Sequence, residues 1–130
     1  MSVRRVMWLL TAGYWAVLFV LTHLPPTRMM HGPSNDKLQH FAAYFVLSMA
    51  LGTTMWVATP ARRRVAPLVA LGVCAAYGIF DELTQPIVGR SAEVGDWVAD
   101  VSGATVAALI LFGAQALSTR RPRPELAAQA

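Results

Sequence analysis

The chain has 130 residues, of which 55% are hydrophobic and 14% are charged, with a formal net charge of +4 at pH 7. A soluble domain contains about 25% charged residues, so this composition excludes an ordinary soluble domain and favours a small integral membrane protein. The arginines form short clusters beside apolar segments, which predicts contact with membrane lipids and excludes nucleic acid as a partner. The single cysteine, Cys74, rules out an internal disulfide.

Four apolar segments are long enough to cross a bilayer, which requires about 20 mostly apolar residues. The first, Val6–Leu24, is too long for the apolar core of a secretory signal, so we expect a retained helix. Prolines and glycines separate it from the other three, Leu38–Ala58, Val65–Leu83 and Val94–Leu117. We therefore predict an all-α fold, a polytopic membrane four-helix bundle that forms one domain over residues 1–117. A disordered, basic cytoplasmic tail is expected over residues 118–130.

The basic residues predict how the bundle is oriented. Eight of the eleven lysines and arginines lie before the first segment, between the second and third, or after the fourth. Basic residues favour the cytoplasm, so both termini are expected there. Six of the seven acidic residues then gather at the opposite end: Asp36, Asp81, Glu82, Glu93, Asp96 and Asp100. The sequence thus predicts a polar cluster at the extracytoplasmic end of the bundle.

The second segment begins with polar side chains in a helical pattern. Asp36, His40 and Tyr44 recur every four residues, so they share one face of the helix, and Lys37 neighbours His40. Asp36 either caps the helix or belongs to a site. His40 lies one turn inside the membrane, where an ionisable group is a functional candidate. The alternative is a neutral histidine bonded to a neighbouring helix.

The third segment ends in two adjacent carboxylates followed by a glutamine. Gln85 lies three residues after Glu82 and four after Asp81, so it can approach either acid. The adjacent acids imply that water reaches them or that one is protonated. We interpret Asp81 as solvated at the interface and Glu82 as a site residue. In the next loop, Arg90 is expected to pair with Glu82 or Asp96, or to hold an anionic headgroup.

The fourth segment also begins with acids on one face. Asp96 and Asp100 are four residues apart, and Gly103 follows as a small residue that permits close helix packing. The helix N-terminus stabilises Asp96, whereas Asp100, one turn deeper, requires a partner, a proton or an ion. Trp97 fits an interfacial aromatic belt.

The stretches DKLQHFAAY and ELTQPIVGRSAEVGDWVADVSGA resemble the VanZ-like membrane proteins. That family's pattern runs D-K-x-x-H-x-x-x-Y, then E-x-x-Q, G-R-S, and D-x-x-x-N with a following glycine. The resemblance extends from about residue 36 to residue 110, and Asp100 replaces the commoner asparagine. It implies an extracytoplasmic role in the bacterial cell envelope. The family is named for a protein associated with low-level resistance to teicoplanin, a glycopeptide that acts on the cell wall.

These observations predict a protein that binds or modifies the headgroup of an envelope lipid or cell-wall precursor. The alternatives are a non-catalytic membrane scaffold or partner subunit and, third, a proton- or ion-coupled carrier. The expected catalytic residues are His40, Glu82, Asp96 and Asp100. The expected substrate-binding residues are Asp36, Lys37, Tyr44, Gln85, Arg90 and Ser91. We predict no metal ligands and no cofactor. Binding of a divalent cation such as Mg²⁺ or Ca²⁺ is the alternative, because these ions prefer oxygen ligands. Catalysis, the substrate and the oligomeric state are left open.

Overall fold

The computed structural model describes residues 1–24 and 36–119, and this part of the chain is helical with no strand. Two short 3-10 helices, η3 and η4, accompany four long α-helices. The elements are α1 (Val3–Thr22), α2 (Asp36–Ala58), η3 (Pro60–Arg62), α3 (Ala66–Thr84), η4 (Gln85–Val88) and α4 (Val94–Thr119). All four long helices have the length and apolar composition needed to cross a membrane. The predicted all-α, multi-pass membrane fold is therefore confirmed.

Proline and glycine set several helix boundaries close to their predicted positions. Pro67 lies in the first turn of α3, where a missing backbone N–H costs nothing. Pro86 follows the end of α3, and Gly89 closes η4 with a φ of 79°, a left-handed conformation that glycine adopts without strain. The last helix continues to Thr119, two residues beyond the predicted end at Leu117. The rest of the predicted tail lies outside the described residues.

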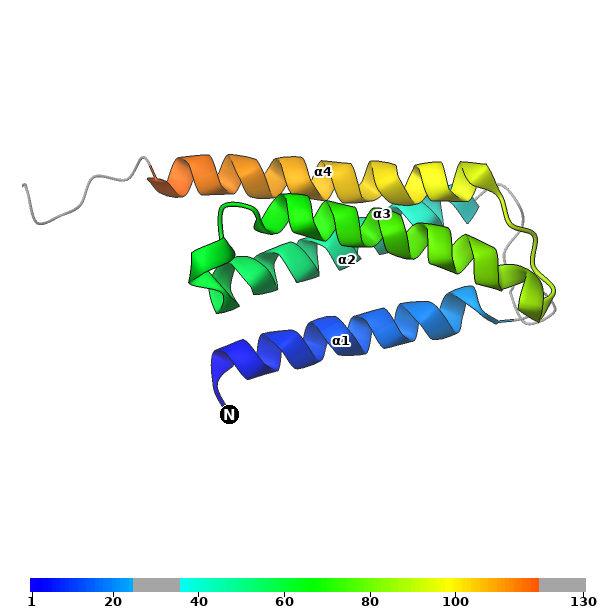
Figure 1. Ribbon diagram of the computed structural model, residues 1–130, viewed down its shortest axis with the longest axis horizontal. Helices are drawn as coiled ribbons and strands as arrows, with labels where there is room; N and C mark the ends of the chain where they lie inside the picture. Colours follow the sequence, from blue (N-terminus) through cyan, green and yellow to red (C-terminus); the bar gives the residue numbers. More distant parts are fainter. Residues whose placement is uncertain (25–35, 120–130) are drawn as a thin grey trace, which may run out of the picture.

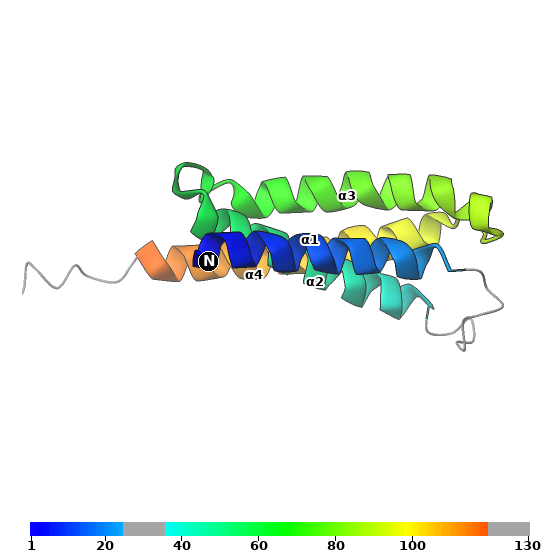
Figure 2. The same cartoon turned by 90° about the horizontal axis from the view of Figure 1, so that it is seen from below.

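Three of the helices form the closely packed part of the bundle. Helices α2, α3 and α4 pack against one another, whereas α1 lies alongside and packs chiefly on α2 (Figures 1 and 2). Only 17% of the apolar window of α1 is buried within the protein, against 33–39% for the other three helices. Most of the α1 surface therefore faces the surroundings of the bundle, which in a membrane are lipid.

Glycines allow the three packed helices to approach one another closely. A Cβ atom at Gly103 of α4 would collide with the backbone carbonyl oxygen of Phe41 in α2. A Cβ at Gly52 would lie 2.5 Å from Cδ1 of Leu111, and one at Gly78 would lie 3.0 Å from Oδ2 of Asp100. Small residues at such contacts are typical of membrane helices, whose association depends on close packing. These contacts fix how α2, α3 and α4 are rotated relative to one another.

The charged residues separate to the two ends of the bundle. We call the end where α1 and α3 end and α2 and α4 begin the polar end; it is on the right in Figure 1. The acids found there are Asp36, Asp81, Glu82, Glu93, Asp96 and Asp100. The opposite end carries the arginines of the α1 start and of the α2–α3 connection: Arg4, Arg5, Arg62, Arg63 and Arg64. The polar cluster expected from the sequence therefore forms at one end.

Candidate functional site

His40 lies at the centre of the polar end, between two carboxylates of α4. Its Nδ1 atom is 2.9 Å from Oδ1 of Asp100, and its Nε2 atom is 3.9 Å from Oδ2 of Asp96. The side chain of His40 is 5% exposed and that of Asp100 is fully buried. The spacing of four residues places both acids on the same face of α4. Asp100 thus has the partner that its depth was expected to require, and the histidine is bonded to a neighbouring helix.

Glu82 of α3 is buried beside this group. Its Oε2 atom accepts a hydrogen bond from the backbone N–H of Glu93 at 2.7 Å, which ties the end of α3 to the start of α4. Its Oε1 atom is buried and has no hydrogen-bond partner among the residues that the structure describes. Glu82, which we interpreted as a site residue, is 7% exposed in this position.

Within the described residues, Lys37 and Arg90 of the polar end pair with acids of other elements. A guanidinium nitrogen of Arg90 lies 3.7 Å from Oδ1 of Asp36, instead of facing the expected Glu82 or Asp96. The ammonium of Lys37 lies 3.1 Å from Oδ1 of Asp96 and 3.1 Å from Oε2 of Glu93. These pairs connect the first turn of α2 to α4 and to the loop before it.

A second buried group connects α1 to α3, and the interpretation of Asp81 as a solvated interfacial acid was wrong. Asp81 is 0% exposed because the end of α1 covers it. Its Oδ1 accepts a hydrogen bond from the Thr22 hydroxyl at 2.7 Å and lies 3.7 Å from Nδ1 of His23. Its Oδ2 accepts one from the Gln85 amide at 3.3 Å. We name Thr22, His23, Asp81 and Gln85 the Asp81 group.

Two members of the Asp81 group, Thr22 and His23, were not among the residues predicted from the sequence. The available signal was a pair of polar side chains at the end of an otherwise apolar segment. His23 also bonds through Nε2 to the hydroxyl of Thr84 at 2.9 Å, so three polar contacts fasten this end of α1 to α3. Farther along the same two helices, the rings of Trp15 and Tyr77 pack edge to face at a centroid distance of 5.1 Å.

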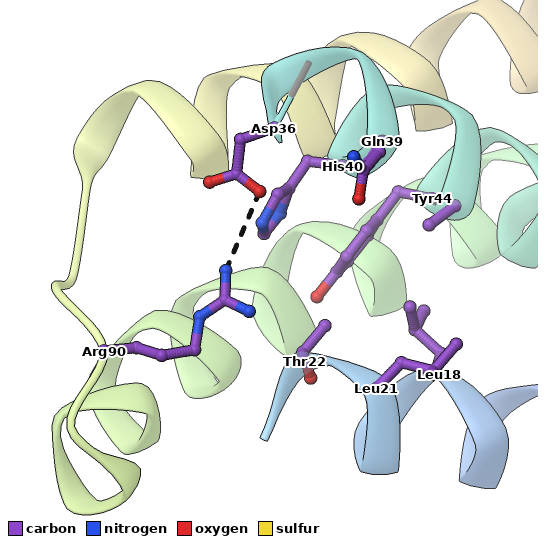
Figure 3. Close-up of a pocket in the computed structure, with 9 residues that line it drawn as sticks. Leu18, Leu21, Thr22, Asp36, Gln39, His40, Tyr44 and Arg90 are labelled. Atoms are coloured by element: carbon purple, nitrogen blue, oxygen red, sulfur yellow. Dashed lines mark ion pairs between the residues drawn. The ribbon is translucent and has the colours of Figure 1, made fainter. Parts of the chain in front are cut away.

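A cavity of about 140 Å³ opens beside His40, between the end of α1 and the start of α2 (Figure 3). One part of its wall is apolar and comes from Leu18, Leu21 and Ala43. The other part is polar or charged and comes from Thr22, Asp36, Gln39, His40, Tyr44 and Arg90. In Figure 3, Arg90 reaches across from the loop toward Asp36, and the ring of Tyr44 points toward α1. The cavity therefore presents an apolar surface and a charged surface together.

The predicted site residues divide according to their distance from this cavity. Asp36, His40, Tyr44 and Arg90 line it. The buried carboxylates of Asp100 and Asp96 flank His40. Lys37 pairs with acids at the rim, Gln85 bonds to Asp81, and Ser91 lies exposed in the loop. The half-buried ring of Trp97 donates a hydrogen bond to the carbonyl oxygen of Ala75 at 3.1 Å, so it also joins α4 to α3.

This geometry supports two kinds of chemistry. A histidine held by a carboxylate at one ring nitrogen can take up or release a proton at the other nitrogen, which here is Nε2. Nitrogen and carboxylate oxygen atoms also come close enough to share a cation. Two groups have ligand atoms within 4.8 Å of one another, Asp36–His40–Asp96 and His40–Glu82–Asp100.

A protein-family model described as VanZ/LLP1 matches residues 8–115, which include most of α1 and α4 and all of α2 and α3. The match contains every predicted site residue and extends beyond the stretch on which the motif resemblance rests. No curated protein and no solved structure matches the chain.

Proposed function

Since this chain belongs to the VanZ/LLP1 family, we propose that it binds or modifies an envelope lipid or a lipid-linked cell-wall precursor of bacteria, holding the polar headgroup at the polar end. The observation that carries this proposal is the cavity between α1 and α2, whose wall is apolar on one side and charged on the other. A ligand with a charged headgroup and an apolar chain matches both surfaces. A fully polar solute would leave Leu18 and Leu21 without a favourable contact.

The size of the cavity indicates which part of such a ligand it receives. Sites that enclose a drug-sized molecule measure about 300–1,000 Å³. The cavity here is about 140 Å³, enough for a headgroup but not for acyl chains. The chains would remain along the exposed apolar surface of α1, where Leu21 is half exposed and Val17 more so. The protein would thus hold a lipid that stays mostly in the bilayer.

Arg90 and His40 are the residues that would recognise the headgroup. A guanidinium binds phosphate through two parallel hydrogen bonds, a stronger arrangement than its present 3.7 Å approach to Asp36. A lipid phosphate could therefore replace Asp36 as the partner of Arg90. His40, held by Asp100, faces the same cavity and would exchange a proton or a hydrogen bond with the headgroup.

We expect the protein to retain a lipid phosphate through Arg90. In native mass spectrometry from detergent, phosphatidic acid should be retained more strongly than diacylglycerol with the same acyl chains. Arg90→Gln should weaken this retention about tenfold or more, since hydrogen bonds to charged groups are worth about 1.5–3 kcal/mol. The control is Arg63→Gln, at an exposed arginine of the opposite end. Equal retention of the two lipids, or no effect of Arg90→Gln, would contradict the proposal.

The proposal extends to glycopeptide susceptibility. A protein that occupies or alters a cell-wall precursor would change how a teicoplanin-type drug acts. Expression of this chain in a susceptible bacterium is expected to lower teicoplanin susceptibility, and Arg90→Gln should remove the effect while membrane levels of the protein stay the same. If the Arg90→Gln variant lowered teicoplanin susceptibility as much as the original protein, the effect would not depend on the cavity.

We also propose that the polar end faces outward and that both termini are cytoplasmic, as the distribution of arginines favours. In intact cells, Ser91→Cys should react with a membrane-impermeant thiol reagent, whereas Ser118→Cys should react only after lysis. The native Cys74 is fully buried and provides a low background. The reverse labelling pattern would place the cavity in the cytoplasm and exclude an envelope headgroup as its ligand.

A non-catalytic scaffold is the second candidate, favoured by the Asp81 group, because its contacts from Thr22 and His23 join the end of α1 to α3. A proton- or ion-coupled carrier has less support. Toward the arginine end of the described helices, the buried polar side chains are hydroxyls, such as Thr11 and Thr54, which bond to each other at 2.9 Å. A proton path normally contains ionisable groups.

A further inference from the structure

We infer that His40, Glu82 and Asp100 form a binding site for a divalent transition-metal cation. The three side chains come from α2, α3 and α4, and one ligand atom from each lies within 4.8 Å of the other two. All three side chains are buried. The site lies next to the lipid cavity through His40, but its existence does not depend on the proposed headgroup binding.

Two buried oxygen atoms of this group point to a ligand. Neither Oε1 of Glu82 nor Oδ2 of Asp100 has a hydrogen-bond partner among the described residues. Buried carboxylate oxygens are normally hydrogen-bonded or coordinated to a metal. A cation bound between the carboxylates of Glu82 and Asp100, whose ligand atoms lie within 4.8 Å of each other, would supply the partner that these buried groups lack.

The other charges of the polar end favour this group over the second one. Lys37 pairs with Asp96 and Glu93, and Arg90 pairs with Asp36. The group Asp36–His40–Asp96 therefore already contains two acids with basic partners. In the group of His40, Glu82 and Asp100, the histidine is the basic residue that faces the two acids. Its excess of negative charge is the property that attracts a cation.

The donor set indicates which cation fits. Calcium and magnesium prefer sites made of oxygen ligands, whereas imidazole suits zinc and related transition metals. One imidazole with two carboxylates is a mixed set that suits Zn²⁺ or Mn²⁺, rather than the Mg²⁺ or Ca²⁺ that the acids alone suggest. Gly78 leaves room for the carboxylate of Asp100, because a Cβ atom at this position would lie 3.0 Å from Oδ2 of Asp100.

A cation here would also define the role of His40. Nδ1 is the nitrogen that faces Asp100, so it is the atom that would bind the metal. A neutral imidazole bound through Nδ1 carries its proton on Nε2. The histidine would then donate a hydrogen bond toward Asp96 and the cavity, and it would not act as a proton acceptor.

The test measures metal binding by the full-length protein in detergent. After removal of metal with EDTA, titration with Mn²⁺ is followed by the loss of the free-ion electron paramagnetic resonance signal, and melting temperatures are recorded with Zn²⁺, Mn²⁺, Mg²⁺ and Ca²⁺. We expect one Mn²⁺ per chain and a higher melting temperature with Zn²⁺ or Mn²⁺ than with Mg²⁺ or Ca²⁺. Glu82→Gln and Asp100→Asn should each weaken Mn²⁺ binding at least tenfold.

The matched control is Glu93→Gln, which makes the same chemical change at an acid of the same end whose side chain is 55% exposed. It should alter the Kd for Mn²⁺ less than twofold. Asp100→Asn preserves the shape of the side chain, so it serves if Glu82→Gln fails to fold. The site is refuted if no cation raises the melting temperature, or if Glu93→Gln weakens binding as much as Asp100→Asn. Neither result would alter the phosphatidic acid measurement, which tests the headgroup proposal separately.

Discussion

Gly103→Ala is expected to destabilise the bundle by about 2–3 kcal/mol, near the upper end of typical overpacking costs. The added Cβ would collide with the carbonyl oxygen of Phe41 and would lie 3.0 Å from the backbone nitrogen of Phe45. Backbone atoms of a helix cannot rotate away as a side chain can, so α2 and α4 would have to separate. The same movement would lengthen the hydrogen bond between His40 and Asp100, which joins these two helices.

Gly113→Ala provides the control on the same helix. A Cβ at Gly113 would have no neighbour within 4 Å. Alanine is preferred over glycine inside a helix by up to about 1 kcal/mol, so this change should be neutral or slightly stabilising. The measurement is unfolding of both variants in detergent, followed by circular dichroism. If Gly103→Ala were as stable as Gly113→Ala, α2 and α4 would not be in close contact at Gly103.

Asp81→Ala is expected to destabilise the protein by about 2–4 kcal/mol, because one or two buried donors lose their acceptor at about 1–3 kcal/mol each. Gln85 loses its partner completely, and its Oε1 already has none among the described residues. Thr22 keeps a hydrogen bond to the carbonyl oxygen of Phe19 at 3.1 Å, which limits the loss. The end of α1 would be held less firmly to α3.

Asp81→Asn separates hydrogen bonding from charge. The asparagine oxygen can still accept from Thr22, and the Gln85 amide can turn to accept from the new NH₂ group. We therefore expect the free energy of unfolding of the Asp81→Asn variant to lie within about 1 kcal/mol of that of the original protein. Unfolding in detergent gives both values, and Trp15, which packs on Tyr77, reports the attachment of α1 by its fluorescence. An Asp81→Ala variant of unchanged stability would show that this group does not fasten α1.

Much of the helical architecture could be predicted from the sequence, because it depends on local properties. Hydropathy over about 20 residues identifies each membrane span, and proline and glycine limit its ends. The first residues of α2 and α4 therefore lie within two residues of the predicted starts. Which side chains share a helix face also follows from local geometry, as with Asp36, His40 and Tyr44, all of which line the cavity.

The partners across helices could not be predicted, because they depend on how each helix is rotated and tilted. Arg90 faces Asp36, and Asp96 is paired with Lys37, although the sequence made Arg90 the expected partner of Glu82 or Asp96. Close contacts between backbones, such as the one at Gly103, fix these rotations. No spacing within a single helix contains that information.

The sequence by itself determined the number of spans, the separation of acids from arginines, and the candidate residues on each helix face. Only the tertiary structure decided which acids are buried. Adjacent in sequence, Asp81 and Glu82 point to different neighbours: Asp81 toward Thr22 of α1, and Glu82 toward the backbone of Glu93. Burial depends on what another part of the chain places over a side chain. For Asp81 that cover is the end of α1, more than fifty residues earlier in the chain.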